Sequence, residues 1–178
     1  MLFRSVGAAK ANALDYAMKK EILDARATGD SIGSVVECVA NGVPAGLGGL
    51  MFGGMESRIS AALFALPGVR GVEFGAGFAI AGMRGSTAND PIRIEDDHIS
   101  TETNHSGGLD GLTNGTPLIL RCALRPTPSI VREQKTVDLT KLENTTIRLR
   151  GRYDPCSAPR MLPAIEAAVA LCLLDAIL

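Results

Sequence analysis

Residues 151–178 read GRYDPCSAPRMLPAIEAAVALCLLDAIL, a polar turn followed by a long apolar segment, and this stretch decides much of the fold. After Arg160 only Glu166 and Asp175 are charged, so a helix here is apolar around most of its circumference. We therefore predict a helix over 159–177 that is buried on more than one side. A membrane span needs about 20 apolar residues, and two carboxylates interrupt this shorter segment.

The turn before this helix presents two opposite charges, Arg152 and Asp154. Gly151 permits a backbone turn that a side chain would hinder, and Pro155 fixes one backbone dihedral. The charged side chains are therefore held in place. Taken alone, the pair has two interpretations: a surface ion pair worth about 0 to 1 kcal/mol, or two groups directed at a ligand.

Apolar spacing along the rest of the chain predicts alternating helices and strands. Asn12 is the expected N-cap of the first helix and Gly29 its expected end. The polar segment 84–103 is predicted to be a surface loop. Short turns between neighbouring strands favour antiparallel pairing, so the predicted fold class is α+β, with an antiparallel sheet packed on helices. Further helices are predicted at 12–27 and 54–66, and strands at 31–40, 69–74, 77–83, 117–124 and 141–150.

The composition is that of a compact globular chain, with 178 residues, 46% of them hydrophobic, and a net charge of −1. This balance gives no electrostatic reason to expect a nucleic acid or a membrane as a partner. No signal-peptide pattern follows Arg4, so a cytoplasmic location is expected. The cysteines lack Cys-x-x-Cys spacing and are expected to be buried thiols, with no metal site. They are Cys38, Cys122, Cys156 and Cys172.

Short motifs with specific spacing are spread over residues 15–178. They are GDSIG (29–33), VPAGLG (43–48), GVRGVEFGAGF (68–78), RGS (84–86), TNHSGG (103–108), TNG (113–115), RPTPSI (125–130), KTVDL (135–139), and GRYDPC with PR (151–160). Their order resembles that of the chorismate synthase family. The resemblance implies a fold equivalent to half of that family's β-α-β sandwich.

The resemblance also implies a reaction. The family eliminates phosphate from 5-enolpyruvylshikimate 3-phosphate in a 1,4 sense to give chorismate, a step of the shikimate pathway of aromatic amino acid biosynthesis. This carbon–oxygen lyase uses reduced FMN although there is no net redox change, and NADPH is an expected reductant. The family is tetrameric, so a homo-oligomer is the expected assembly.

The chain is expected to be the C-terminal half of such an enzyme. Residues 1–14 match none of the motifs and form a separate segment, whereas 15–178 form the chorismate synthase-like region. The family's N-terminal signatures and its two catalytic histidines have no counterpart, because the only histidines here are His98 and His105. The chain alone is therefore expected to be inactive. The alternative is a non-catalytic subunit of a split enzyme that binds flavin or anions, or that serves assembly.

Site residues follow from the same resemblance. Asp154 matches the aspartate that manages the proton near flavin N5, and Arg152 matches an arginine at the flavin and substrate. Arg84 and Arg160 add positive charge for a substrate with two carboxylates and a phosphate. The expected flavin-binding residues are Pro67, Gly68, Gly111, Arg125, Pro126, Thr127, Pro128, Ser129 and Arg152.

Several of these segments also have a structural interpretation. Residues 125–129 offer a cation and two hydroxyls to a phosphate, but equally form a proline-stiffened connection. The Pro67-Gly68 pair is also a plain helix stop, and His105 in a glycine-rich turn is more often structural. Gly111 lies in a loop one residue shorter than the family pattern. Tyr153 replaces the usual histidine and is expected to point away from its charged neighbours.

Overall fold

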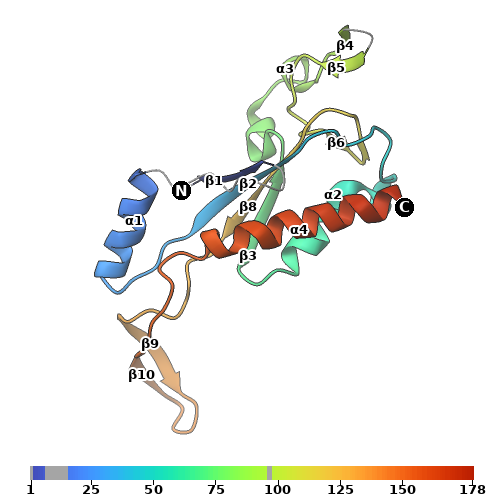
Figure 1. The fold of residues 1–178 in the computed structure, drawn as a ribbon. Helices are drawn as coiled ribbons and strands as arrows, with labels where there is room; N and C mark the ends of the chain where they lie inside the picture. Colours follow the sequence, from blue (N-terminus) through green and yellow to red (C-terminus); the bar gives the residue numbers. More distant parts are fainter. Residues whose placement is uncertain (1, 7–15, 96–97) are drawn as a thin grey trace.

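The computed structural model describes residues 2–6, 16–95 and 98–178, and it is built around one sheet (Figure 1). Within these described ranges the sheet has four strands. The third in spatial order is antiparallel to both of its neighbours, and the first, at one edge, runs parallel to the second. Helices pack against one face, so the predicted α+β class with an antiparallel sheet on helices is confirmed. In spatial order the strands are β1 (Leu2–Val6), β2 (Ser34–Ala40), β8 (Leu118–Leu124) and β3 (Val69–Phe74).

The core lies between this sheet and two helices, α2 (Met55–Phe64) and α4 (Ala158–Ile177), which cover the same face (Figure 1). Alternate side chains of β8 are buried, as a half-buried strand requires. Ile59 and Leu63 on α2 and Ile165 on α4 are fully buried in the same cluster. This packing is the main source of the stability of the fold.

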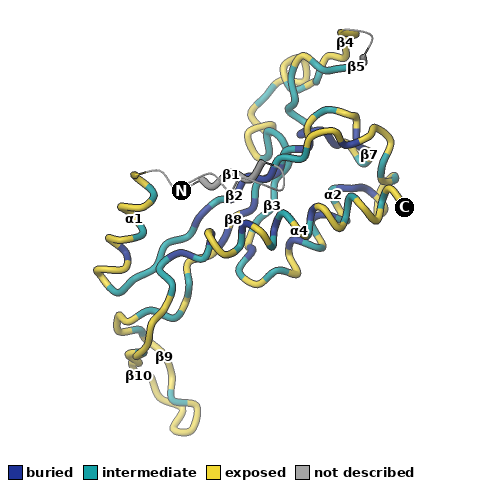
Figure 2. The backbone as a smooth tube through the Cα atoms, viewed as in Figure 1, coloured by how far each residue is buried: buried dark blue, intermediate teal, exposed yellow. Residues whose placement is uncertain are grey.

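The prediction that α4 is buried on more than one side is wrong for this chain. Its buried residues lie on one face in its N-terminal part, including Leu162 and Val169. On the C-terminal part Leu171 is 65% exposed and Ile177 is 56% exposed. An apolar helix that meets the sheet with one face leaves its opposite face uncovered, and Figure 2 shows this exposure along α4.

Three elements project from the core (Figures 1 and 2). One is α1 (Tyr16–Ala27), and the others are the hairpins of β9 (Glu133–Asp138) with β10 (Glu143–Arg148) and of β4 (Ile92–Glu95) with β5 (His98–Thr101). Because β9 and β10 pair only with each other among the described residues, β10 is exposed throughout rather than half-buried as predicted.

The predicted helices are confirmed as α1, α2 and α4, and four predicted strands correspond to β2, β3, β8 and β10. Gly29 follows α1 with a φ of 69°, as expected for a residue that ends a helix. The expected N-cap Asn12 lies outside the described residues.

Two predictions are corrected. Residues 77–83 do not form a strand but a 3-10 helix, η2 (Gly77–Gly82). Gly75 and Gly77 both have positive φ and turn the chain away from the sheet, and the Phe78 amide donates to Glu73 Oε2 at 3.2 Å. The segment 84–103 is a surface segment but not a plain loop, since it holds α3 (Gly85–Ala88) and the β4–β5 hairpin. The remaining short elements are η1 (Met51–Gly53), β6 (Leu109–Asp110) and β7 (Leu112–Thr113).

The cysteines are free thiols, and three of the four are buried, with Cys172 partly exposed. Burial raises the pKa of Cys122 to about 12, and burial together with the Glu166 charge raises that of Cys38 to about 11. None of the described helices has both the length and the apolar character to cross a bilayer. No three His, Cys, Asp or Glu side chains among the described residues are grouped to hold a metal ion.

Candidate functional site

A cavity of about 590 Å³ lies between the C-terminal part of α1, residues 129–131 and the turn 151–155. Four of the residues expected to act on a ligand line it together: Ser129, Arg152, Asp154 and Arg160. They come from segments more than 20 residues apart in the chain. The fold therefore brings a hydroxyl, a guanidinium and a carboxylate to one concave surface.

Backbone contacts at one end of the sheet explain this convergence. The Ile32 amide donates to the Pro155 carbonyl at 2.8 Å, and the Ser31 hydroxyl donates to the Thr127 carbonyl at 2.6 Å. The short segment that leads into β2 is thus held on one side by 125–129 and on the other by the turn before α4. It positions both predicted site segments.

The expected flavin residues Gly68 and Arg125 meet at the same end of the sheet, where the Arg125 amide donates to the Gly68 carbonyl at 2.9 Å. The Arg125 and Pro67 side chains are exposed there. Within the 125–129 segment, Ser129 is the residue that lines the cavity. The structure thus places the 67–68 and 125–129 segments side by side, with only part of the second in the cavity wall.

Gly111 does not join this group. Its amide donates to Glu56 Oε1 at 2.8 Å, and its carbonyl accepts from the Met55 amide at 2.9 Å, so it closes the N-terminus of α2. This is the opposite end of the sheet, about 20 Å away along the length of β8. Arg84 is the N-cap of α3, which Figure 1 places beyond the same far end of the sheet. The structure therefore separates these two residues from the cavity.

Charge in the cavity is set by three arginines and two carboxylates. Arg160 Nη1 lies 2.9 Å from Asp154 Oδ2, so Asp154 is paired with Arg160 and not with its neighbour Arg152. Asp30 is paired with Arg132 at 2.7 Å, and hydrogen bonds from the Ser31 amide and from Arg132 hold the pKa of its carboxyl below the usual value. Arg152 and Arg26 have no ion-pair partner among the described residues. The cavity therefore carries an excess of positive charge.

Part of the cavity wall is apolar. It is formed by Ile22 and Leu23 of α1 and by Ile130 and Val131 after the proline segment. Leu23 is 59% exposed and Val131 is 39% exposed, so apolar surface faces the opening. A cavity with one apolar wall and a cationic rim suits a ligand that combines a flat ring system with an anionic group.

The expectation that Tyr153 points away from the charged pair is wrong. Tyr153 lines the same cavity as Arg152 and Asp154. Its ring folds back over Gly151 and its hydroxyl donates to the Arg150 carbonyl at 3.2 Å. Because the ring is turned onto the backbone of the preceding residues, it forms part of the cavity surface.

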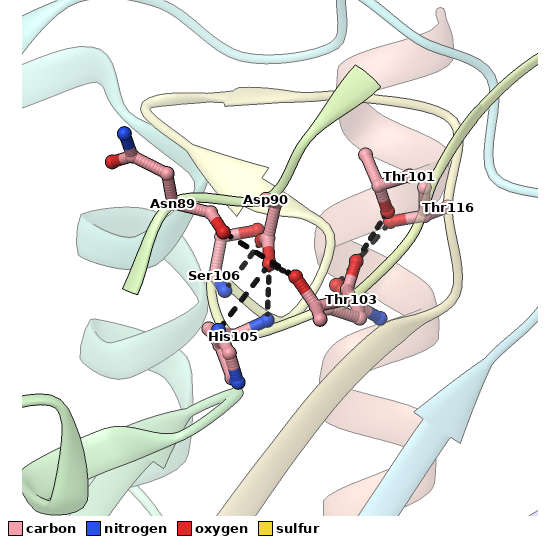
Figure 3. A network of polar contacts seen from close by, with 8 residues as sticks. Asn89, Asp90, Thr101, Thr103, His105, Ser106 and Thr116 are labelled. Carbon is pink, nitrogen blue, oxygen red and sulfur yellow. Dashed lines mark hydrogen bonds and ion pairs between the residues drawn. The ribbon is translucent and has the colours of Figure 1, made fainter. Parts of the chain in front are cut away.

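The TNHSGG motif belongs to a different cluster, centred on Asp90 (Figure 3). The Thr103 hydroxyl and the His105 amide each donate to Asp90 Oδ1 at 2.7 Å, and the Ser106 amide donates to Oδ2 at 2.9 Å. His105 Nδ1 lies 3.7 Å from Asp90 Oδ1. Burial by itself raises the pKa of the Asp90 carboxyl, but the hydrogen bonds from Ser106, Thr103 and His105 outweigh it and hold the pKa at about 2. This part of the motif is therefore structural.

Asp90→Asn is expected to lower the free energy of unfolding by about 2 kcal/mol near pH 6, because the folded pKa of about 2 lies well below the unfolded value of 3.8. A lowered folded pKa stabilises the fold above the unfolded pKa, and this contribution is lost as the pH falls from 4 to 2. Urea denaturation at pH 6, 4 and 2.5 measures it. Asp110→Asn, which removes a nearby exposed carboxylate, is the control. Equal pH dependence of the Asp90 variant and the wild type would contradict the assignment.

Comparison with known proteins identifies the family of this chain. A sequence model of the family described as chorismate synthase matches residues 4–178. The chain belongs to the chorismate synthase family. It is 50% identical over 163 residues to the chorismate synthase of Thermococcus kodakarensis, over 91% of this chain and 46% of that protein. It is 50% identical over 151 residues to the chorismate synthase of Archaeoglobus fulgidus, over 84% of this chain and 42% of that protein.

A crystal structure of a chorismate synthase superposes with a TM-score of 0.72 at 28% identity, over 91% of this chain and 42% of that chain. The chain thus spans about half the length of the curated chorismate synthases it matches. The family match begins at residue 4, N-terminal to the boundary at residue 15 that the short motifs indicated. The division into 1–14 and 15–178 stays a prediction.

Four residues that line the cavity lie outside the motifs that carry the resemblance: Ile22, Leu23, Arg26 and Val131. In the sequence, the first three read as ordinary positions of an amphipathic helix. Only the turn at Gly29 and the hydrogen bond from the Val131 amide to the Gly29 carbonyl, 3.0 Å long, bring α1 over the cavity.

Proposed function

We propose that this chain supplies the C-terminal part of a chorismate synthase active site, and that the cavity beside the turn 151–155 takes FMN and the anionic substrate. The supporting observation is the convergence of Ser129, Arg152 and Asp154 on one cavity that has an apolar wall and a cationic rim. The reaction proposed is the elimination of phosphate from 5-enolpyruvylshikimate 3-phosphate to give chorismate.

The residues of the cavity fit FMN. Ile22, Leu23 and Val131 offer apolar surface to a ring system, and Ser129 and Arg152 offer donors to the phosphate and the ribityl chain. When bound, reduced flavin supplies electron density as phosphate leaves the substrate.

Asp154 is the proposed proton carrier, because it is the carboxylate of the turn that also brings Arg152 to the cavity. Its Oδ2 is held by Arg160 at 2.9 Å, which fixes the orientation of the carboxylate and leaves Oδ1 for a ligand. Arg152, which has no ion-pair partner among the described residues, is the proposed contact to bound anions. The departing phosphate also needs a proton donor.

No histidine lines this cavity among the described residues, since His105 lies in the Asp90 cluster at the other end of the sheet. The acid–base groups for phosphate departure would therefore come from outside this chain, and we expect the chain alone to be inactive. The remaining properties are proposed from family membership: NADPH as reductant, a homotetramer, and a cytoplasmic location.

Arg152→Gln is expected to weaken FMN binding by about 10-fold, the effect of losing one charged hydrogen bond. The measurement is a titration of FMN against the 178-residue chain, followed by flavin fluorescence. Lys135→Gln, at an exposed position of β9 that does not line the cavity, removes an equal charge and is the control. If both variants bind FMN as the wild type does, Arg152 is not a ligand contact and the proposed site is in the wrong place.

The alternative function, an assembly subunit without catalysis, is favoured by one observation, the exposed apolar face of α4 at Leu171, Leu174 and Ile177. Contiguous apolar surface of this kind marks a contact with another chain or segment. The same titration separates the two functions. A chain that associates but has no measurable affinity for FMN would fit the assembly subunit.

A further inference from the structure

We propose that Arg26, in the last turn of α1, is a phosphate-binding residue of the cavity and that α1 forms one wall of the phosphate site. The proposal rests on the proposed function, because both use the same cavity, but it adds a residue and an element that the motifs do not include. The ligand group is a phosphate monoester, which both FMN and the substrate carry.

Arg26 lines the same cavity as Arg152. The acidic residues that lie nearest to it in the sequence are already paired with other cations. Asp24 is bound to Lys20 at 2.7 Å, and Asp30 is bound to Arg132 at 2.7 Å. Among the described residues Arg26 has no carboxylate partner of its own. Its charge is therefore free to act on a ligand.

The end of α1 is fixed by several contacts rather than left free. The Asp30 amide donates to the Ala25 carbonyl at 2.9 Å, and the Gly29 amide donates to the Arg26 carbonyl at 3.2 Å. Ala25 is buried, and the Val131 amide donates to the Gly29 carbonyl at 3.0 Å. These contacts hold the Arg26 backbone at the rim of the cavity, so binding an anion there does not require ordering of the helix end.

The charges on the rim match a phosphate monoester. Asp154 neutralises Arg160, which leaves Arg26 and Arg152 as the two unpaired cations of the cavity among the described residues. A phosphate monoester carries a charge of about −1.5 to −2 near pH 7. Guanidinium groups bind such oxygens in a bidentate manner, which a lysine cannot reproduce.

A purely structural role for Arg26 makes a different prediction. A cation in the last turn of a helix interacts favourably with the helix dipole, and its loss then affects stability and not ligand binding. The phosphate-site proposal requires the reverse: Arg26→Gln changes affinity for phosphate-bearing ligands while riboflavin, which lacks the phosphate, binds as before.

The test titrates FMN, riboflavin, inorganic phosphate and shikimate 3-phosphate into the wild-type chain and into Arg26→Gln, Arg26→Lys and Arg152→Gln. Lys19→Gln, an exposed charge on the same helix outside the cavity, is the matched control. We expect Arg26→Gln to weaken FMN and inorganic phosphate by about 5- to 10-fold, Arg26→Lys by less, and Lys19→Gln not at all. Thermal unfolding of each variant confirms that it is folded.

The outcomes separate this proposal from the proposed function. In one outcome, Arg152→Gln weakens FMN binding, whereas Arg26→Gln binds FMN, inorganic phosphate and shikimate 3-phosphate as the wild type does. That result leaves the proposed function standing and overturns the role of Arg26. An equal loss of riboflavin binding in Arg26→Gln also overturns it, since the phosphate is then not what Arg26 contacts. A loss confined to inorganic phosphate and shikimate 3-phosphate supports the proposal and assigns Arg26 to the substrate. A wild-type chain that binds none of the four ligands overturns both proposals.

Discussion

Replacing Asp154 with asparagine is expected to lower the turnover of an assembled enzyme by about 100- to 10,000-fold, the range for loss of one acid–base group. The amide has nearly the shape of the carboxylate but cannot carry a proton between flavin and substrate. FMN affinity should change little, because Arg152 and Ser129 still line the cavity. The effect should therefore appear in kcat rather than in KM.

Because the chain spans about half the length of the chorismate synthases it matches, the assay adds the N-terminal part of such an enzyme by fusion or co-expression. Chorismate formation is followed anaerobically with reduced FMN, and FMN binding is measured on the same samples. Asp175→Asn is the control, because Asp175 pairs with Arg58 on the surface outside the cavity. Wild-type turnover in the Asp154 variant would show that the turn serves only to form its ion pair with Arg160.

Gly75→Ala is expected to lower the free energy of unfolding by about 2 to 5 kcal/mol, the largest stability effect that we expect of a single substitution in this chain. Gly75 has a φ of 53°, and a Cβ there would lie 2.1 Å from the His105 carbonyl oxygen and 2.4 Å from the Gly107 amide nitrogen. Both neighbours are backbone atoms, so neither can move aside by changing a rotamer. Strain in φ and a backbone clash therefore add together.

Urea denaturation of the wild type and of two alanine variants separates these two contributions. Gly42 also has a positive φ, 72°, but a Cβ there would meet nothing within 4 Å. Gly42→Ala should therefore cost only about 1 kcal/mol, from the backbone conformation alone. Equal losses of unfolding free energy in the Gly42 and Gly75 variants would mean that the close backbone contact of Gly75 with residues 105–107 does not constrain the fold.

The sequence alone determined the elements whose pattern is local. The strand 117–124 and the helix 159–177 were predicted within one residue at each end, because a continuous apolar run between turn residues leaves few alternatives. The motifs also identified the family, since their residues and spacing are properties of the chain itself. For residues 77–83 the predicted strand is wrong, because a short apolar run has the same sequence pattern whether or not it pairs with a sheet.

Only the tertiary structure decided which residues share the cavity. Gly111 and Arg152 are both expected from the family resemblance, yet the length of β8 separates them. Arg26 lines the cavity with Arg152 although no quoted motif contains it. The ion-pair partner of Asp154 is Arg160, although Arg152 is nearer in the sequence. Spacing along the chain fixes local conformation, whereas proximity across segments depends on how the sheet and helices pack, which hydrophobic burial and backbone hydrogen bonds determine together.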